Sequence, residues 1–254
     1  MSAEPGDLPC DEASVAPPRR IRSFVRREGR LTEGQRDALQ RLAPQFSLDR
    51  LSGSLDLPDL FGRVAPVCFE IGFGSGTALL ARAQAQAERN HLGIEVHRPG
   101  VGRVLIEIER LGLRNVRVMT RDAVEVLREQ IAPVALAELV IEFPDPWHKT
   151  RHHKRRLIQP DFVRLACSRL APGGFLRLAT DWAHYAEQMR EVCNAEPQLQ
   201  NVAADGGFVP RPDARPVTRF EARGERLGHA VFDLAYRRTQ TAAVDAPGPG
   251  VIHE

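Results

Sequence analysis

The residues most suited to chemistry lie in one stretch of the chain, 142–156. An apolar run ends at Phe143, after which two prolines flank Asp145. Trp147 follows, and all but one of residues 148–156 are Lys, Arg or His. A carboxylate whose backbone is restricted by prolines, beside an aromatic ring and a cationic strip, predicts chemistry on an anionic polymer.

A glycine-rich sequence, E-I-G-F-G-S-G at 70–76, follows an apolar run expected to be a strand. Glycines there let the backbone approach a ligand, and the next helix offers free N–H groups. A dinucleotide fingerprint would place its third glycine at position 77, which is Thr77. Glu70 would repel a pyrophosphate and attract a cationic amino-acid group. We therefore expect cofactor contacts from Glu70, Gly72, Gly74 and Gly76.

Two further acids stand at the ends of expected strands. Glu95 lies about twenty residues beyond the loop, where a carboxylate can accept both ribose hydroxyls. Asp122 can accept from an adenine amino group, or it can cap the following helix. Strand ends line the ligand crevice of an open α/β sheet, so these acids describe an adenosyl, ribose-bearing and cationic ligand. S-adenosylmethionine has these features, whereas NAD and ATP fit poorly.

The elements that position these residues alternate between strands and helices. Strands are expected at 67–71, 91–96, 116–120, 136–143 and 175–179, and helices at 77–88, 99–111, 122–130, 160–170 and 182–194. This alternation predicts an α/β fold with a doubly wound, mostly parallel sheet. The apolar and aromatic residues of 231–236 predict a closing strand that can enter the sheet antiparallel.

The 254 residues fit one domain with extensions. We divide them into an acidic, proline-rich disordered tail (1–18), a basic arm and N-terminal helix (19–62), an α/β domain (63–238) and a disordered tail (239–254). The arginines of 19–30 form either a solvated arm or a segment that orders on RNA or over a cofactor. Thr32 and Gln35 predict a capping box at the first helix.

Composition excludes several classes of protein. The net charge is only +2, so any basic surface must be local. The four cysteines are scattered and form no C-x-x-C pair, which argues against a zinc knuckle and a disulfide framework. His148, His152 and His153 lack a nearby Cys or spaced acid, so no metal is expected. Without a signal-peptide pattern or an apolar stretch of roughly 20 residues, we expect a cytoplasmic protein with no membrane contact.

Four motifs, taken in order, resemble the bacterial tRNA (guanine-N7-)-methyltransferases. They are F-E-I-G-F-G-S-G, G-I-E-V-H-R-P-G-V-G, R-D-A-V-E-V-L and F-P-D-P-W-H-K-T-R-H-H-K-R-R-L. The resemblance covers roughly 21–237. P-D-P-W followed by K-x-R-H-x-K-R-R is highly specific to this family, whereas the glycine loop alone indicates only the broader class I methyltransferases.

The resemblance implies methyl transfer from S-adenosylmethionine to N7 of guanine 46 in the tRNA variable loop, by a seven-stranded Rossmann-like domain with one antiparallel strand near its C-terminus. The cofactor contacts it implies are Glu70, Glu95, Asp122 and Asp145, with Asp145 also the catalytic residue. The substrate-binding positions it implies are Lys149, Asp181, Thr218, Arg219, Phe220 and Glu221. The RNA-contacting positions are Arg151, His152, His153, Lys154, Arg155 and Arg156. We expect a monomer or a homodimer.

Several roles stay open at the level of sequence. Guanine N7 carries a lone pair and no proton, so Asp145 would stabilise transferred charge or hold the base, rather than act as a base. Trp147 would stack on the base or pack in the core. Asp181 would contact substrate or cap a helix. Glu221 would complete a capping box begun by Thr218 and could also read a guanine edge.

Three other functions compete with this interpretation. A methyltransferase acting on another RNA or on a small molecule would keep the glycine loop and the acids without needing the cationic strip. A catalytically silent RNA-binding module would keep the strip without needing Glu70, Glu95 and Asp122. A nucleotide-dependent oxidoreductase is disfavoured by the glycine spacing.

Overall fold

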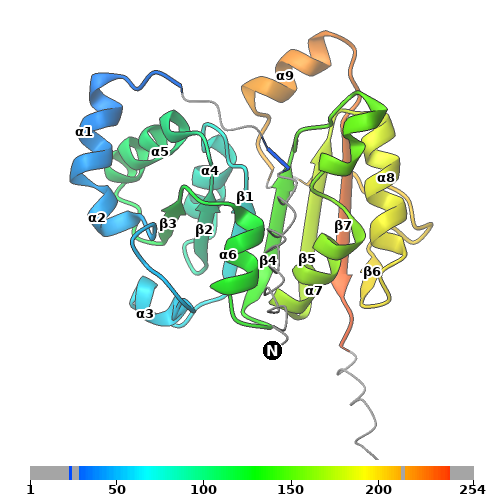
Figure 1. Cartoon of the computed structure of the whole chain (residues 1–254), viewed down its shortest axis with the longest axis horizontal. Helices are drawn as coiled ribbons and strands as arrows, with labels where there is room; N and C mark the ends of the chain where they lie inside the picture. The colour runs from blue at the N-terminus through cyan, green and yellow to red at the C-terminus, as the bar shows by residue number, and fades with distance from the viewer. Residues whose placement is uncertain (1–22, 25–28, 213–214, 241–254) are drawn as a thin grey trace, which may run out of the picture.

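A computed structural model describes residues 23–24, 29–212 and 215–240 (Figure 1). The predicted tail at 1–18, most of the arginine-rich arm and nearly all of the predicted tail at 239–254 lie outside these residues. The division of the chain at 18, 62 and 238 therefore stays a prediction.

Seven strands form one sheet in the order β3-β2-β1-β4-β5-β7-β6. Their bounds are β1 Val67–Ile71, β2 Asn90–Ile94, β3 Val116–Met119, β4 Leu136–Glu142, β5 Leu170–Thr180, β6 Leu199–Asn201 and β7 Phe232–Arg238. Strands β1 to β5 pair in parallel, and β7 is antiparallel to both of its neighbours. The predicted seven-stranded, mostly parallel sheet with one antiparallel strand near the C-terminus is confirmed.

Helices cover both faces of the sheet, as the doubly wound prediction requires (Figure 1). The predicted ones are α4 Thr77–Ala85, α5 Arg98–Leu111, α6 Ala123–Glu129, α7 Pro160–Arg169 and α8 Ala183–Asn194. One apolar core joins the sheet to α6, α7 and α8, and a second joins it to α1, α4 and α5. Phe69 and Leu79 represent the two cores, and both are fully buried. Burying a side chain of this size stabilises the fold by about 1.5–3 kcal/mol.

Within residues 29–66, the described chain before β1 forms three helices that pack on this domain: α1 Glu33–Arg41, α2 Ala43–Phe46 and α3 Leu57–Phe61. The predicted capping box begins α1, since the Gln35 N–H donates to Thr32 Oγ1 at 3.2 Å and the Thr32 N–H donates to Gln35 Oε1 at 2.9 Å. Phe46 and Leu57 are buried in the cores. The sequence did not predict α2 and α3 because each is shorter than the span in which helical periodicity can be read.

Four further features were not predicted as such. β5 begins at Leu170 rather than at Phe175, because Leu170 pairs with Leu136 ahead of a register shift. The short strand β6 pairs with β7 at the edge of the sheet. A 3-10 helix, η1 Thr150–Arg155, carries the cationic strip, and α9 Arg219–Arg226 lies between β6 and β7 in the chain.

Candidate active site

A cavity of about 640 Å³ lies at the carboxyl ends of β1, β2 and β4. This is the edge at which open α/β sheets bind ligands. The predicted site residues that line it are Gly72, Glu95, Asp122, Asp145, Lys149 and His152. Trp147 and His148 also line it, as do Ser23 and Phe24 of the arm. The structure thus joins predicted site residues that lie up to 80 positions apart in the sequence, from Gly72 to His152.

All three glycines of the loop have a left-handed backbone conformation, with φ of 77° at Gly72, 55° at Gly74 and 76° at Gly76. A Cβ added at Gly76 would lie 2.0 Å from Cγ2 of Val104 in α5, so helix packing also requires a glycine there. Gly72 lines the cavity, whereas Gly74 and Gly76 are not among its lining residues. Gly74 and Gly76 therefore shape the loop through their backbone conformation, and their predicted contact with the cofactor stays a prediction.

Glu95 and Asp122 are both fixed by backbone donors. The Glu95 carboxylate accepts from the N–H of Gly74 at 2.8 Å and from the N–H of His97 at 2.9 Å. Asp122 Oδ1 accepts from the Val124 N–H at 2.9 Å and so caps α6, while the residue also lines the cavity. Helix capping and ligand contact are compatible at Asp122, because a carboxylate has a second oxygen.

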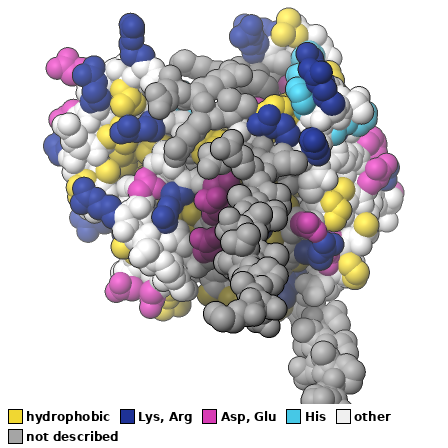
Figure 2. All heavy atoms as spheres, in the orientation of Figure 1, with side chains coloured by type: hydrophobic (Ala, Val, Ile, Leu, Met, Phe, Trp, Pro, Cys, Tyr) yellow, Lys and Arg dark blue, Asp and Glu magenta, His cyan; other side chains and the backbone are white. Residues whose placement is uncertain are grey.

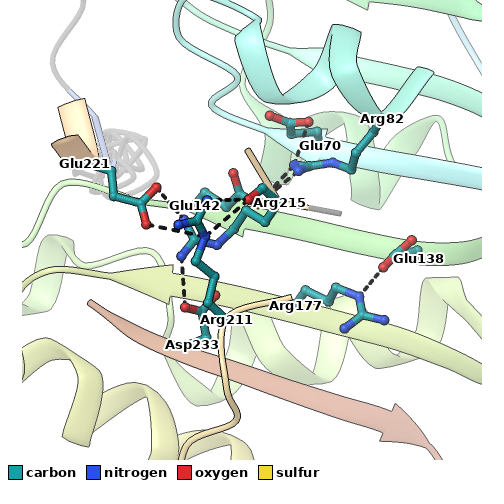
Figure 3. Close-up of polar contacts among 9 residues, drawn as sticks. All are labelled: Glu70, Arg82, Glu138, Glu142, Arg177, Arg211, Arg215, Glu221 and Asp233. Atoms are coloured by element: carbon teal, nitrogen blue, oxygen red, sulfur yellow. Dashed lines mark hydrogen bonds and ion pairs between the residues drawn. The ribbon is translucent and has the colours of Figure 1, made fainter. Parts of the chain in front are cut away.

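Glu70 is not among the residues that line this cavity, and its predicted contact with the cofactor stays a prediction. Its side chain is 4% exposed and accepts from Nη2 of Arg82 in α4 at 3.0 Å (Figure 3). Ile71 and Gly72, which directly follow Glu70, line the cavity at the end of β1. Burial raises the pKa of Glu70 to about 7, against the opposing effect of the Arg82 charge.

The loop around Asp145 is strained at both ends. Phe143 has φ of 52° and Trp147 has φ of 46°, and these are two of the three non-glycine residues with positive φ in the described chain. Such a conformation costs on the order of 1–3 kcal/mol per residue and persists where the surroundings enforce it. Between them, Asp145 is exposed and lines the cavity. Strain concentrated on the residues flanking one carboxylate favours a functional role for that carboxylate.

The first end of this loop is held by β5 and by Arg215. The Phe143 N–H donates to the Ala179 carbonyl at 2.8 Å, which continues the pairing of β4 with β5. The Arg215 guanidinium lies 5.6 Å from the centre of the Phe143 ring. Arg215 in turn donates to Glu221 at 2.8 Å and to Asp233 at 2.9 Å (Figure 3).

Trp147 belongs to neither hydrophobic core and is half-buried. Its Nε1–H donates to the Ser23 carbonyl at 3.1 Å, and the Arg155 guanidinium lies 4.1 Å from its ring centre. The His152 ring meets it edge-on at 5.8 Å. The alternative in which Trp147 packs in the core is therefore wrong, and its ring joins η1 to the arm at the rim of the cavity.

The cationic strip lies on the surface except at its end. Lys149, Arg151 and Lys154 are exposed, and Arg155, His152 and His153 are partly exposed. Figure 2 shows Lys and Arg side chains beside His side chains near the upper end of α8 in this view. Burial, together with the charges of Arg151 and Arg155, lowers the pKa of His152.

Arg156 ends the strip and is only 2% exposed, so the predicted contact with RNA is corrected. Its Nε–H donates to the Pro146 carbonyl at 2.8 Å, and Nη1 donates to Gln188 Oε1 at 2.5 Å. Nη1 also lies 3.0 Å from Nδ1 of His184. Sequence alone could not separate this arginine from its neighbours, because the turn at the end of η1 decides which side chain points inward.

The other predicted substrate residues are Asp181, Thr218, Arg219, Phe220 and Glu221. Among those with described side chains, Asp181, Thr218 and Glu221 do not line the cavity. Thr218 Oγ1 accepts from the Glu221 N–H at 3.2 Å, which confirms the Thr218 half of the predicted capping box. The Glu221 side chain is fully buried against Arg215, so the prediction that it reads a guanine edge does not hold in this arrangement. The side chains of Arg219 and Phe220 lie outside the described part of the structure.

Asp181, at the end of β5, lies beside α9 rather than in the cavity. Its Oδ2 is 3.6 Å from Nδ1 of His229, and α8 has Trp182 as its N-cap residue with no side-chain cap. The alternative in which Asp181 caps α8 is therefore wrong.

A row of buried charges behind the cavity was missed at the level of sequence (Figure 3). Arg82 donates to Glu142 at 3.0 Å, and Arg89 and Arg177 both pair with Glu138. The sequence did contain a signal for these charges, because two acids, at 138 and 142, lie within the otherwise apolar β4. Buried carboxylates require cationic or hydrogen-bonding partners, so these two acids indicate that cationic side chains lie nearby.

The described residues contain no group of three or more His, Cys, Asp or Glu that could hold a metal ion. Among the helices of the described chain, none is long and apolar enough to cross a membrane.

The sheet order, the glycine loop and the strand-end acids define a class I, Rossmann-like methyltransferase. The 16S rRNA methyltransferase KamB shares this fold with a TM-score of 0.51 at 14% identity, over 76% of this chain and 98% of that one. The family model "Putative methyltransferase" matches residues 64–234.

Curated relatives specify the family further. The tRNA (guanine-N(7)-)-methyltransferase of Alkalilimnicola ehrlichii is 56% identical over 87% of this chain and 94% of the relative. That of Methylococcus capsulatus is 55% identical over 88% and 96%. The chain belongs to the tRNA (guanine-N(7)-)-methyltransferase family.

Proposed function

We propose that this protein transfers a methyl group from S-adenosylmethionine to N7 of a guanine in tRNA, guanine 46 of the variable loop. One observation carries the proposal: Glu95, Asp122 and Asp145 line the same cavity, and the cationic strip lies at the rim of that cavity. The names of the relatives support the same reaction. Action in the cytoplasm, as a monomer or a homodimer, stays a prediction.

The cavity fits S-adenosylmethionine in size and in chemistry. Its volume of about 640 Å³ lies within the range of small-molecule and cofactor sites. Glu95, fixed by two backbone N–H groups, would accept from the ribose hydroxyls, and Asp122 would accept from the adenine amino group. When bound, the cofactor supplies an electrophilic methyl group on a sulfonium. Glu70 would support the cofactor site indirectly, because its ion pair with Arg82 holds α4 in place.

Asp145 would be the catalytic residue. Guanine N7 has a lone pair and no proton, so no base is required, but the reaction places positive charge on the guanine ring. The Asp145 carboxylate would stabilise that charge or hold the base by accepting from its N1–H and amino group. The strained backbone on either side of Asp145 would hold the carboxylate in place with little freedom.

The exposed cations next to this carboxylate would bind the phosphates of tRNA. Lys149 lines the cavity, and Arg151 and Lys154 point to solvent on η1. Phosphate contacts fix the position of a nucleic acid without reading its sequence. We therefore assign this strip to placing one guanine over Asp145, with base recognition left to the cavity.

Incubation of unmodified tRNA with labelled S-adenosylmethionine, followed by mapping of aniline-sensitive 7-methylguanosine, tests the proposal. Cleavage at guanine 46 is the expected result. Label elsewhere in the RNA would favour a different RNA methyltransferase, and tRNA binding without label would favour a silent binding module.

A further inference from the structure

We propose that Arg156 is a positioning residue that holds the Asp145 loop in its reactive conformation, rather than a ligand of tRNA phosphate. The inference rests on the proposed function, in which Asp145 is the catalytic residue. Arg156 lies in a run of cations that continues to the exposed surface, yet its own side chain is 2% exposed. A guanidinium at this depth cannot reach a phosphate without leaving its contacts.

Arg156 contacts both the Asp145 loop and α8. Its Nε–H donates to the carbonyl of Pro146, the residue directly after Asp145, at 2.8 Å. Its Nη1 reaches Gln188 and His184, and its guanidinium lies 4.7 Å from the ring centre of Tyr185. Tyr185 and Met189 of the same helix are fully buried in the core. The arginine therefore ties the loop to one of the most firmly packed helices.

The charge of Arg156 has no acidic partner among the described residues, and its Nη2 has no hydrogen-bond partner there. Burial lowers the pKa of this arginine. A buried cation without a counter-ion is costly, and replacing such a group by an apolar one is often neutral or stabilising. Stability alone is therefore a weak reason for a cation at this position.

The geometry of a guanidinium supplies the reason. Its rigid fork can donate to a loop carbonyl on one edge and to helix side chains on the other, which a lysine ammonium on a flexible stem cannot match. The loop needs such a tie because Trp147, next to Pro146, has φ of 46°. Without the tie, the backbone can relax toward negative φ and move Asp145. A displacement of about 1 Å can cost roughly 100-fold in rate.

The test compares four variants in tRNA methylation and in tRNA binding over a series of salt concentrations. For Arg156→Met we expect kcat to fall about 100-fold, with the salt dependence of tRNA binding unchanged. Arg156→Lys should lose less activity. Lys154→Met, which removes an exposed cation, should weaken binding and reduce the salt slope by about 1. The matched control is Arg190→Met, which removes a half-buried arginine of α8 that pairs with Glu187, and it should leave kcat unchanged.

A second approach does not depend on the folding of Arg156→Met. Gln188→Leu removes the acceptor at the far end of the tie and should also lower kcat, with the salt slope unchanged. The chain contains two tryptophans, so in a Trp182→Phe background the fluorescence reports Trp147 alone. There, both Arg156→Lys and Gln188→Leu should make Trp147 emission more red-shifted and more readily quenched by acrylamide.

Two results would overturn this inference. One is a flattened salt slope with near-normal kcat in the Arg156 variants, which would make Arg156 a phosphate ligand. The other is normal kcat and unchanged Trp147 fluorescence in Arg156→Lys and Gln188→Leu. Failure of the proposed function is distinguishable, because the unaltered protein would then produce no 7-methylguanosine, whereas the fluorescence comparison would still report the loop.

Discussion

Arg82 joins two carboxylates from neighbouring strands, since its guanidinium donates to Glu70 of β1 and to Glu142 of β4, each at 3.0 Å. Glu70 directly precedes the strand residue that lines the cavity, and Glu142 ends β4 just before the strained loop. Arg82 lies on α4, which follows the glycine loop. One buried cation thus links the loop expected to bind the cofactor with the loop that carries Asp145.

Removing Arg82 should destabilise the protein strongly. In Arg82→Met, Glu70 and Glu142 would remain buried without their cation, which typically costs about 3–5 kcal/mol. Urea unfolding measures the free energy of unfolding directly. The matched control is Arg41→Met, because Arg41 pairs with Glu109 at the surface with both side chains about half exposed, and such pairs contribute about 0–1 kcal/mol. Similar losses for the two variants would refute a special role for the buried pair.

The raised pKa of Glu70 predicts a specific pH dependence of stability. Its pKa is about 7 in the folded protein, against an ordinary value of 4.5, so the folded state binds more protons between these two pH values. Its contribution is fully present below pH 4.5 and is lost as pH rises through 7. His91 opposes this trend, because burial lowers its pKa to about 4 and stability therefore falls as pH drops below 6.5.

Glu70→Gln isolates the carboxylate, since His91 is present in both proteins. Urea unfolding at pH 5 and pH 8 should show the unaltered protein losing stability relative to Glu70→Gln as pH rises. An unchanged difference between the two proteins at pH 5 and pH 8 would show that Glu70 stays ionised throughout.

Hydrophobic periodicity and capping residues predicted the structural elements that depend on local sequence. The apolar runs gave β1 to β5 and β7, and Thr32 with Gln35 gave the cap of α1. Local sequence did not predict the direction in which an individual side chain points. Glu70 was expected to attract the cationic group of the cofactor, and the sequence did not show that its carboxylate pairs with Arg82 of α4.

Burial of individual charges was equally inaccessible from sequence. Arg156 is one of three consecutive cations, and only the end of η1 distinguishes it from Arg155. Glu221 fits a capping pattern, yet its burial depends on Arg215 and Asp233, which reach it through tertiary contacts. The strand-end acids were predictable because parallel topology alone brings strand ends together.

Gly76 should tolerate alanine less well than Gly62. Both have positive φ, 76° and 66°, so alanine costs about 1–2 kcal/mol at either position through backbone strain. At Gly62 nothing lies within 4 Å of an added Cβ, whereas at Gly76 Cγ2 of Val104 lies at 2.0 Å. Overpacking should add about 1–3 kcal/mol at Gly76. Thermal or urea unfolding of the two variants checks this, and equal losses would exclude the packing constraint.

The central claim, that the Asp145 carboxylate stabilises the charge formed on guanine, is tested most directly by the turnover number of Asp145→Asn, which keeps the shape of the side chain. Calorimetric titration with S-adenosylmethionine must first show that the variant still binds its cofactor. We then predict that kcat for tRNA methylation falls by about 100-fold or more, as for the loss of other groups that stabilise transition-state charge. Near-normal turnover in a variant that binds its cofactor would contradict the account.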